Sequence, residues 1–196
     1  MKKGCLLLFL LVSLAVSAAE NNLAGFNVGI SSSKFHGGDV GEDLESNIFI
    51  TLGVCSEQGI GNYLGLLMNI NYARKGGEFE VGPNDLSYQL NYLELPILLK
   101  LYLTTKNEVS PTLIFGPVFS IRAGSKIELD NNRVSAKDLR YPDFGLCVGG
   151  GINLPMDDYS AFSMELKYNY GLVRIARNSE VLNNSFKVTV NLMFPI

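Results

Sequence analysis

Several residue types are scarce in this chain of 196 residues. Tryptophan is absent, histidine occurs once, and only three cysteines are present. After residue 19 no run is apolar for the roughly 18 residues that suggest a membrane helix. Three cysteines are too few for a disulfide scaffold, and a lone histidine, His36, excludes a multi-histidine metal site. We therefore expect no metal and no cofactor.

The beginning of the chain has the pattern of a secretion signal. Two lysines are followed by an apolar run over residues 6–16 and by small residues at 17–19, where a signal peptidase would cut. We expect residues 1–19 to be a cleaved signal peptide and residues 20–196 to form one exported domain. Without the two leader lysines, 14 basic residues stand against 19 acidic ones, a net charge of −5. This balance excludes a nucleic-acid partner.

The stretch 91–103, NYLELPILLKLYL, is the most informative part of the chain. Every odd position from Leu93 to Leu103 is Leu or Ile, while the even positions include Glu94 and Lys100. A period of two is typical of an extended strand. Because one face is aliphatic throughout and the other carries charge, the two faces need different solvents, and in an exported protein the aliphatic one is expected to meet lipid.

The same alternation recurs along the chain and predicts eight strands. They are expected near 23–33, 45–56, 62–74, 87–103, 111–124, 143–154, 161–171 and 185–195. The links alternate between long (34–44, 75–86, 125–142, 172–184) and short (57–61, 104–110, 155–160). Outer-membrane barrels combine short periplasmic turns with longer extracellular loops, and only a closed barrel satisfies all strand hydrogen bonds in lipid. The predicted fold class is therefore all-β, an eight-stranded antiparallel up-and-down transmembrane β-barrel.

Each predicted strand presents one apolar row. The last strand is the clearest, with Phe186, Val188, Val190, Leu192 and Phe194 on one face and Lys187, Thr189 and Asn191 on the other. Aromatic residues fall near strand ends, as in an interfacial belt. They are Tyr72, Phe144, Tyr170 and Phe186 on the loop side and Phe162 and Phe194 on the turn side. Cys55 and Cys147, the cysteines outside the leader, are interpreted as unpaired residues of the barrel wall.

The polar face predicts a filled interior. An eight-stranded barrel is just wide enough for side chains to fill, and buried charges need partners. We expect a structural charge network inside the barrel. Its members are Glu94, Lys100, Arg122, Glu165 and Lys167. We predict that Lys100 pairs with Glu165 and that Glu94 pairs with Arg122, and we favour this structural role over a proton or substrate path.

Two further features need an explanation. Pro96 and Pro117 lie inside predicted strands although proline cannot donate to a ladder, so we expect a β-bulge at each. Residues 31–33 are serines close to His36 and Asp39. That set could be arranged as a lipid hydrolase site, but we reject this interpretation, and we expect neither catalytic residues nor enzymatic activity.

Five segments of the chain resemble a known family. They are INYARKGGEF, YLELPILLKLYL, FGPVFSIRAGSK, DFGLCVGGGINL and MELKYNYGLVRI. Together they are similar to the Gram-negative outer-membrane β-barrel proteins that include the PorT-like components. The resemblance implies a location in the outer membrane and contact with its lipids. It also implies use of the barrel-assembly machinery, which reads a terminal aromatic residue, whereas here Phe194 is followed by Pro195 and Ile196.

The function class that follows is a non-enzymatic envelope protein that has a structural role or binds through its loops. The charged loop 125–142 is the best candidate for contacting an extracellular or secretion partner, because loops on a rigid scaffold carry binding. Two alternatives stay open. One is a soluble lipocalin-like barrel with the aliphatic face inward around an apolar ligand, and the other is an accessory component of a secretion apparatus.

Overall fold

The computed structural model describes residues 22–36, 45–46, 48–81, 84–129, 132–133, 142–156, 160–173 and 182–196. The predicted signal peptide lies outside these residues, as does most of the predicted loops 34–44, 125–142 and 172–184. The strands are β1 (Asn22–His36), β2 (Glu45–Ser46), β3 (Ile48–Ile60), β4 (Leu64–Val81), β5 (Asn84–Tyr102), β6 (Ser110–Leu129), β7 (Asn132–Arg133), β8 (Pro142–Pro155), β9 (Ala161–Gly171) and β10 (Leu182–Pro195). No helix in the described part of the chain is long and apolar enough to cross a membrane.

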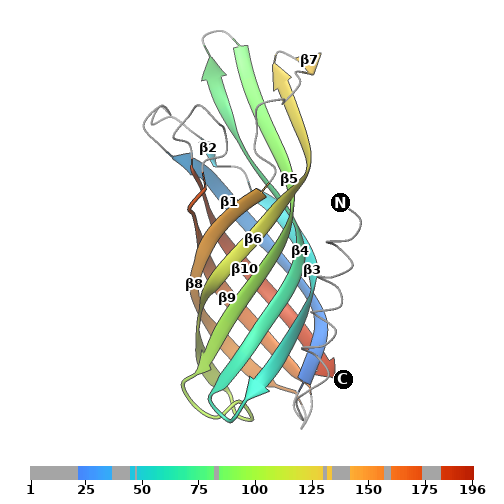
Figure 1. Cartoon of the computed structure of the whole chain (residues 1–196), viewed down its shortest axis with the longest axis vertical. Coiled ribbons are helices and arrows are strands. Elements are labelled where there is room, and N and C mark those ends of the chain that lie inside the picture. The colour runs from blue at the N-terminus through green and yellow to red at the C-terminus, as the bar shows by residue number, and fades with distance from the viewer. Residues whose placement is uncertain are drawn as a thin grey trace.

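Eight long strands close into a barrel. Around the wall the order is β1, β3, β4, β5, β6, β8, β9 and β10, and antiparallel pairing of β10 with β1 completes the circle. The strands are tilted and joined in an up-and-down sequence (Figure 1). The predicted eight-stranded antiparallel transmembrane β-barrel is therefore confirmed. We call the end with the short links 61–63, 103–109 and 156–160 the turn end, and the opposite end the loop end.

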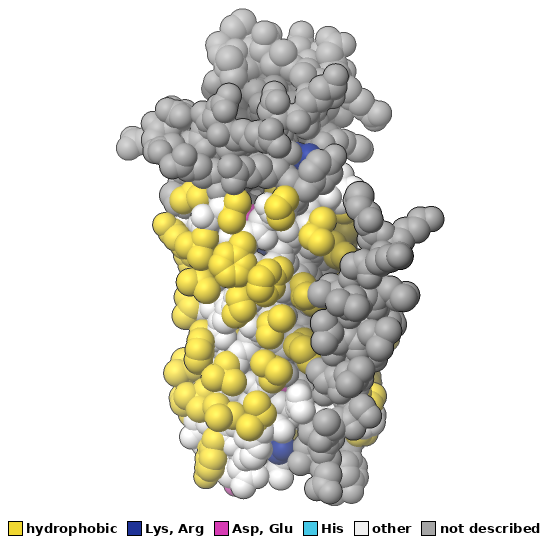
Figure 2. Space-filling view, viewed as in Figure 1, with side chains coloured by type: hydrophobic (Ala, Val, Ile, Leu, Met, Phe, Trp, Pro, Cys, Tyr) yellow, Lys and Arg dark blue, Asp and Glu magenta, His cyan; other side chains and the backbone are white. Residues whose placement is uncertain are grey.

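The apolar rows face outward, as the alternation predicts. On β5 Leu93 is 47% exposed while Glu94 and Lys100 are fully buried. Hydrophobic side chains cover the visible wall, and the Lys and Arg side chains seen on it lie near its two ends (Figure 2). This orientation is opposite to the one that the lipocalin-like alternative requires, and that alternative is wrong.

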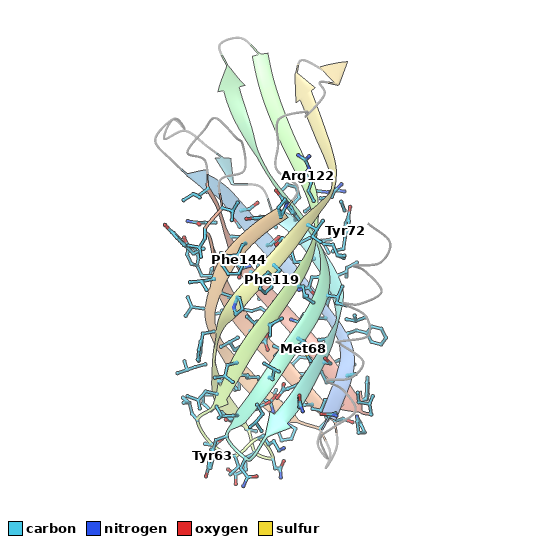
Figure 3. All side chains as sticks on the ribbon, in the orientation of Figure 1. Tyr63, Met68, Tyr72, Phe119, Arg122 and Phe144 are labelled. Carbon is cyan, nitrogen blue, oxygen red and sulfur yellow. The ribbon has the colours of Figure 1, made fainter. Side chains whose placement is uncertain are left out.

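The height of the wall suits a bilayer. β3 contains 13 residues and is about 40 Å long at roughly 3.3 Å per residue. With a strand tilt of about 35–45° it rises roughly 28–33 Å, which accommodates an apolar band about 25 Å tall. Aromatic rings lie toward both ends, with Tyr72 and Phe144 in the half near the loop end and Tyr63 beside the turns (Figure 3). Phe119 packs against Phe144 with ring centroids 5.1 Å apart.

Two predicted links are wrong. Residues 57–61 were expected to form a turn because of Gly59 and Gly61, but β3 continues to Ile60 and the turn occupies residues 61–63, where Gly61 has a φ of 67°. The predicted loop 75–86 is largely a continuation of β4 and β5, which pair up to Val81 and Asn84. Glu57 is thereby placed inside a strand, on the face that points into the barrel.

The prolines do not cause the predicted bulges. Pro96 pairs with Val118 and Pro117 pairs with Leu146, both in unshifted register. The register of β5 against β6 shifts instead between Asn91 and Tyr92. The missing donors are accommodated locally, because the ladders lack bridges beside the prolines. Next to Pro117, Gly116 has a φ of 157°, and a Cβ there would lie 2.3 Å from the carbonyl oxygen of Ile97.

Candidate functional site

The interior of the barrel is lined by buried polar and charged side chains. All five residues of the predicted charge network have side chains on the inward face and are at most 9% exposed. They are Glu94 and Lys100 on β5, Arg122 on β6, and Glu165 and Lys167 on β9. The period of two places them there, because each lies an even number of residues from other buried positions of its strand.

The charges nearest the turn end form one cluster. Lys100 Nζ lies 3.0 Å from Glu57 Oε2 and donates to Asn153 Oδ1 at 3.2 Å. The hydroxyl of Tyr102 donates to the other oxygen of Glu57, and Lys100 Nζ lies 5.0 Å from the centroid of the Tyr102 ring, a distance at which cation–π attraction operates. The predicted partner of Lys100, Glu165, is therefore wrong.

This pairing escaped the sequence prediction for a geometric reason. Glu57 was assigned to a turn, and it reaches Lys100 by passing over the intervening strand β4. Gly65 on β4 makes the passage possible, because a Cβ at this position would lie 2.6 Å from Glu57 Oε1. Gly65, the register partner of Lys100 on the inward face, is the one signal that could have indicated the contact.

A second pair lies near the middle of the lumen. Lys167 Nζ donates to Glu165 Oε2 at 2.6 Å, and Thr189 on β10 donates to the same oxygen at 3.4 Å. Both charged side chains come from β9 and are separated by two residues, so they are neighbours on one face of the strand. Glu165 thus has a cation beside it without a contact across the barrel.

The third pair joins opposite parts of the wall. Lys187 on β10 donates to Glu94 on β5, and both residues are almost completely buried. The sequence pattern placed Lys187 on the inward face but did not select it as a partner. The predicted pairing of Glu94 with Arg122 stays a prediction. Arg122 lies at the loop end of the barrel (Figure 3).

The two cysteines point inward. Cys55 and Cys147 are buried, free, and part of an apolar cluster with Leu67, Leu98 and Ile114. The cluster also contains Val118, Ala161 and Met193, so nearly every strand of the wall contributes to it. Within the described residues, no group of three or more His, Cys, Asp or Glu side chains could hold a metal ion.

Three strands continue beyond the barrel at the loop end. Pairing of β3 with β4 ends at Ala73 and pairing of β6 with β8 ends at Ile121. β4 and β5 nevertheless stay paired as far as Val81 and Asn84, and β5 and β6 as far as Leu86 and Leu129. We call the portions 74–81, 84–91 and 122–129 the projecting sheet. It rises above the rest of the barrel in Figure 1, where β7 lies at its tip.

Comparison with known families agrees with this architecture. A family model described as an outer membrane protein beta-barrel domain matches residues 18–177. The chain belongs to this family. Membership places the chain in the outer membrane. The apolar side chains face outward because they contact the lipid of that membrane. No curated protein matches the chain.

Solved structures of outer-membrane barrels have the same fold. Ail, the attachment invasion locus protein of Yersinia pestis, is 14% identical with a TM-score of 0.52, and the match covers 89% of this chain and 99% of Ail. Neisserial surface protein A is 12% identical with a TM-score of 0.55, covering 90% and 100%. OprG from Pseudomonas aeruginosa is 10% identical with a TM-score of 0.56, covering 89% and 95%. At these identities the similarity concerns the fold alone.

Proposed function

We propose that this outer-membrane barrel is a non-enzymatic protein with a filled lumen that binds a partner outside the cell through the projecting sheet and the charged segment 125–142, of which residues 125–129 belong to β6. The observation that carries the proposal is the contrast between its two parts. Among the described residues, three ion pairs lie in the lumen, whereas β4, β5 and β6 extend well past the barrel, with the short strands β2 and β7 paired to them. A rigid scaffold that raises backbone and loops above a membrane is a common arrangement for binding.

Two of the three serines considered for a hydrolase lie inside the barrel, and Ser32 lies half-buried on the outward face. Ser31 and Ser33 are at most 2% exposed and point into the barrel, where a lipid cannot reach them. The side chain of His36 and the whole of Asp39 lie outside the described residues. The absence of enzymatic activity is thus part of the proposal, and it is supported by the buried position of both inward serines.

The filled lumen has a consequence for ion conduction. We expect the purified protein in planar bilayers to show no steady conductance of porin size, because paired side chains occupy the interior of a barrel this narrow. A porin inserted under the same conditions is the control. Large steady openings in most insertions would contradict the proposal of a closed scaffold.

Partner binding can be tested by photo-cross-linking in intact cells. A photo-reactive amino acid in place of Lys126, on the projecting sheet, is expected to give protein adducts. The same amino acid in place of Leu166, which faces lipid, is expected to give none. Mass spectrometry of the adducts identifies the partner. If position 126 is accessible to added protease and still forms no protein adduct, the binding role is wrong.

The identity of such a partner also tests the narrower interpretation. The resemblance to the PorT-like components favours an accessory role in protein secretion, and that assignment is part of our proposal. A secretion component among the adducts would support it. An adduct with an extracellular protein would instead support a binding role in the envelope.

A further inference from the structure

A groove opens on the lipid-facing side of the barrel near the turn end. Its volume is about 410 Å³, and residues of β1, β3, β4, β5 and β10 line it. Phe26 and Val54 belong to outward rows and are 67% and 46% exposed, so the groove faces the membrane and not the lumen. The volume lies within the range of roughly 300–1,000 Å³ that is typical of small-molecule sites.

Small side chains create the hollow. Ala24 on β1 and Ser56 on β3 are register partners on the outward face, and the next outward pair on the same strands is Phe26 with Val54. Side chains on one face of neighbouring strands stand side by side, so a small pair beside larger residues leaves a recess. Met68, the register partner of Ser56 on β4, borders this recess in the lower half of the barrel (Figure 3).

On its far side the groove ends at an interruption of the ladder between β4 and β5. Bridges are missing for Asn69 with Pro96 and for Ile70 with Leu95, because proline has no N–H to donate to β4. Ile70 and Leu95 line the groove and are half-buried, although they belong to outward rows. The groove therefore crosses the wall from β1 to β5.

Apart from one hydroxyl, the outward side chains around the groove are apolar. Ser56 carries that hydroxyl, which makes no hydrogen bond with the described part of the chain. A polar group beside hydrocarbon is costly without a hydrogen-bond partner. The occupant that fits is therefore an apolar chain that brings a hydrogen-bond acceptor to Ser56.

The position of Ser56 in the membrane identifies the acceptor. Ser56 lies close to the turn end of β3, and the short turns of outer-membrane barrels face the periplasm. Phe194, the register partner of Ala24, is one of the aromatic residues on the turn side. Aromatic residues of this kind lie where the acyl chains meet the polar headgroups, and that is the level of lipid ester carbonyls.

We propose that the groove holds one acyl chain of a diacyl phospholipid from the periplasmic leaflet and retains this lipid longer than the lipids around it. The chain lies against Phe26, Val54 and Leu95, and its ester carbonyl accepts a hydrogen bond from Ser56. The groove is continuous with the surface of the wall that meets lipid, which favours an acyl chain over any water-soluble occupant.

The physical basis of retention is packing together with one hydrogen bond. Within a membrane there is no hydrophobic driving force between apolar surfaces, so association depends on van der Waals contact and hydrogen bonding. A groove contacts a chain on several sides, whereas a flat wall contacts it on one side. Both contributions therefore favour the lipid in the groove over its neighbours.

Native mass spectrometry tests the proposal. The protein is purified from the outer membrane in a mild detergent, and bound phospholipids are counted from the masses of the intact complexes. We expect one phospholipid per wild-type barrel. Ser56→Phe fills the hollow and should abolish retention, while Val148→Phe, at a 60% exposed outward position on β8, should not. Ser56→Ala should lower the retained fraction about fivefold, as expected for the loss of one hydrogen bond.

The rate of lipid exchange gives a second measurement. Because the chain has no tryptophan, Phe194→Trp places a single fluorophore at the groove, and Phe162→Trp places one on the turn side of β9. Each protein is diluted with its retained lipid into detergent micelles that contain phospholipid with brominated acyl chains, which quench the fluorescence. We expect a slow quenching phase for Phe194→Trp that is absent for Phe162→Trp and is lost when Ser56→Phe is added.

Folding of each variant is established first, from the different gel mobility of boiled and unboiled samples. Wild-type barrels without bound phospholipid, or folded Ser56→Phe barrels that retain as much as the wild type, would overturn the proposal. If Ser56→Phe does not fold, Ala24→Leu fills the same hollow and decides. Equal quenching rates at the two fluorophores would also overturn it, and unchanged retention in Ser56→Ala would overturn the ester contact.

The measured masses also reveal other occupants of the groove. A barrel that keeps residues 1–19 and carries no lipid would overturn the proposal, because the apolar leader would then fill the site. A dimer that carries no lipid and is dissociated by Ser56→Phe would overturn it as well, because a second copy of the chain would then cover the groove.

Discussion

Replacing Lys100 with Met is expected to lower the free energy of unfolding by about 3–5 kcal/mol, because the substitution leaves a buried carboxylate without its cation. Lys100 is fully buried, and its Nζ lies 3.0 Å from Glu57 Oε2. Met preserves most of the aliphatic stem, so the change tests the charge more than the packing. Since the chain has no tryptophan, urea unfolding in lipid vesicles is measured by far-ultraviolet circular dichroism and by gel mobility.

A double-mutant cycle isolates the ion pair. Glu57→Gln keeps an acceptor for the hydroxyl of Tyr102 and removes the charge. In Lys100→Met combined with Glu57→Gln, no ion remains unpaired, so much of the stability lost in Lys100→Met should return. If the double variant is as unstable as the two separate losses added together, the pair does not account for the effect, and the cluster at the turn end has been assigned the wrong role.

Leu166→Arg is expected to destabilise the barrel by about 2–4 kcal/mol, the cost of a cation on the lipid-facing side near the bilayer midplane. Leu166 is 53% exposed and is the central residue of the outward row from Phe162 to Tyr170 on β9. The variant is compared with the wild type in the same urea titration. The prediction depends only on which side of the wall meets hydrocarbon.

The matched control places the same charge at a different depth. Leu172 lies just past the end of β9 toward the loop end and is 45% exposed, so Leu172→Arg should cost only about 0–1 kcal/mol near the interface. Equal, small penalties at both positions would show that the outward row does not contact lipid. A large penalty at position 172 would show that the membrane extends further toward the loops than the aromatic residues indicate.

The strands and the direction of their side chains could be predicted because alternation is a local property. On β10 the row from Phe186 to Phe194 differs from its neighbours at every second position, and the structure follows the pattern along the strand. The link at 57–61 could not be predicted equally well. Glycine occurs both in turns and at crowded inward positions of strands. Only the pairing of Gly59 with Gly65 on β4 shows that Gly59 belongs to a strand.

The partners inside the barrel depend on non-local geometry. Height along a strand can be counted from the sequence, but the stagger between neighbouring strands moves residues of similar count to different levels. Lys100 and Glu165 were predicted to pair, yet Lys100 contacts Glu57 instead.

The outcome at the two prolines could not be predicted from the sequence either. A strand can accommodate the missing N–H of Pro96 or Pro117 by losing bridges of the ladder or by forming a bulge, and the sequence does not distinguish the two.

The bond between Lys187 and Glu94 has a consequence for biogenesis. Glu94 enters the wall with β5, but its partner arrives on β10, the strand whose pairing with β1 completes the circle. An intermediate that lacks the last strand would hold Glu94 at membrane depth without the ammonium group of Lys187, which is costly. Insertion and closure are thereby coupled, since this ion pair forms only at the step that joins the two ends of the wall.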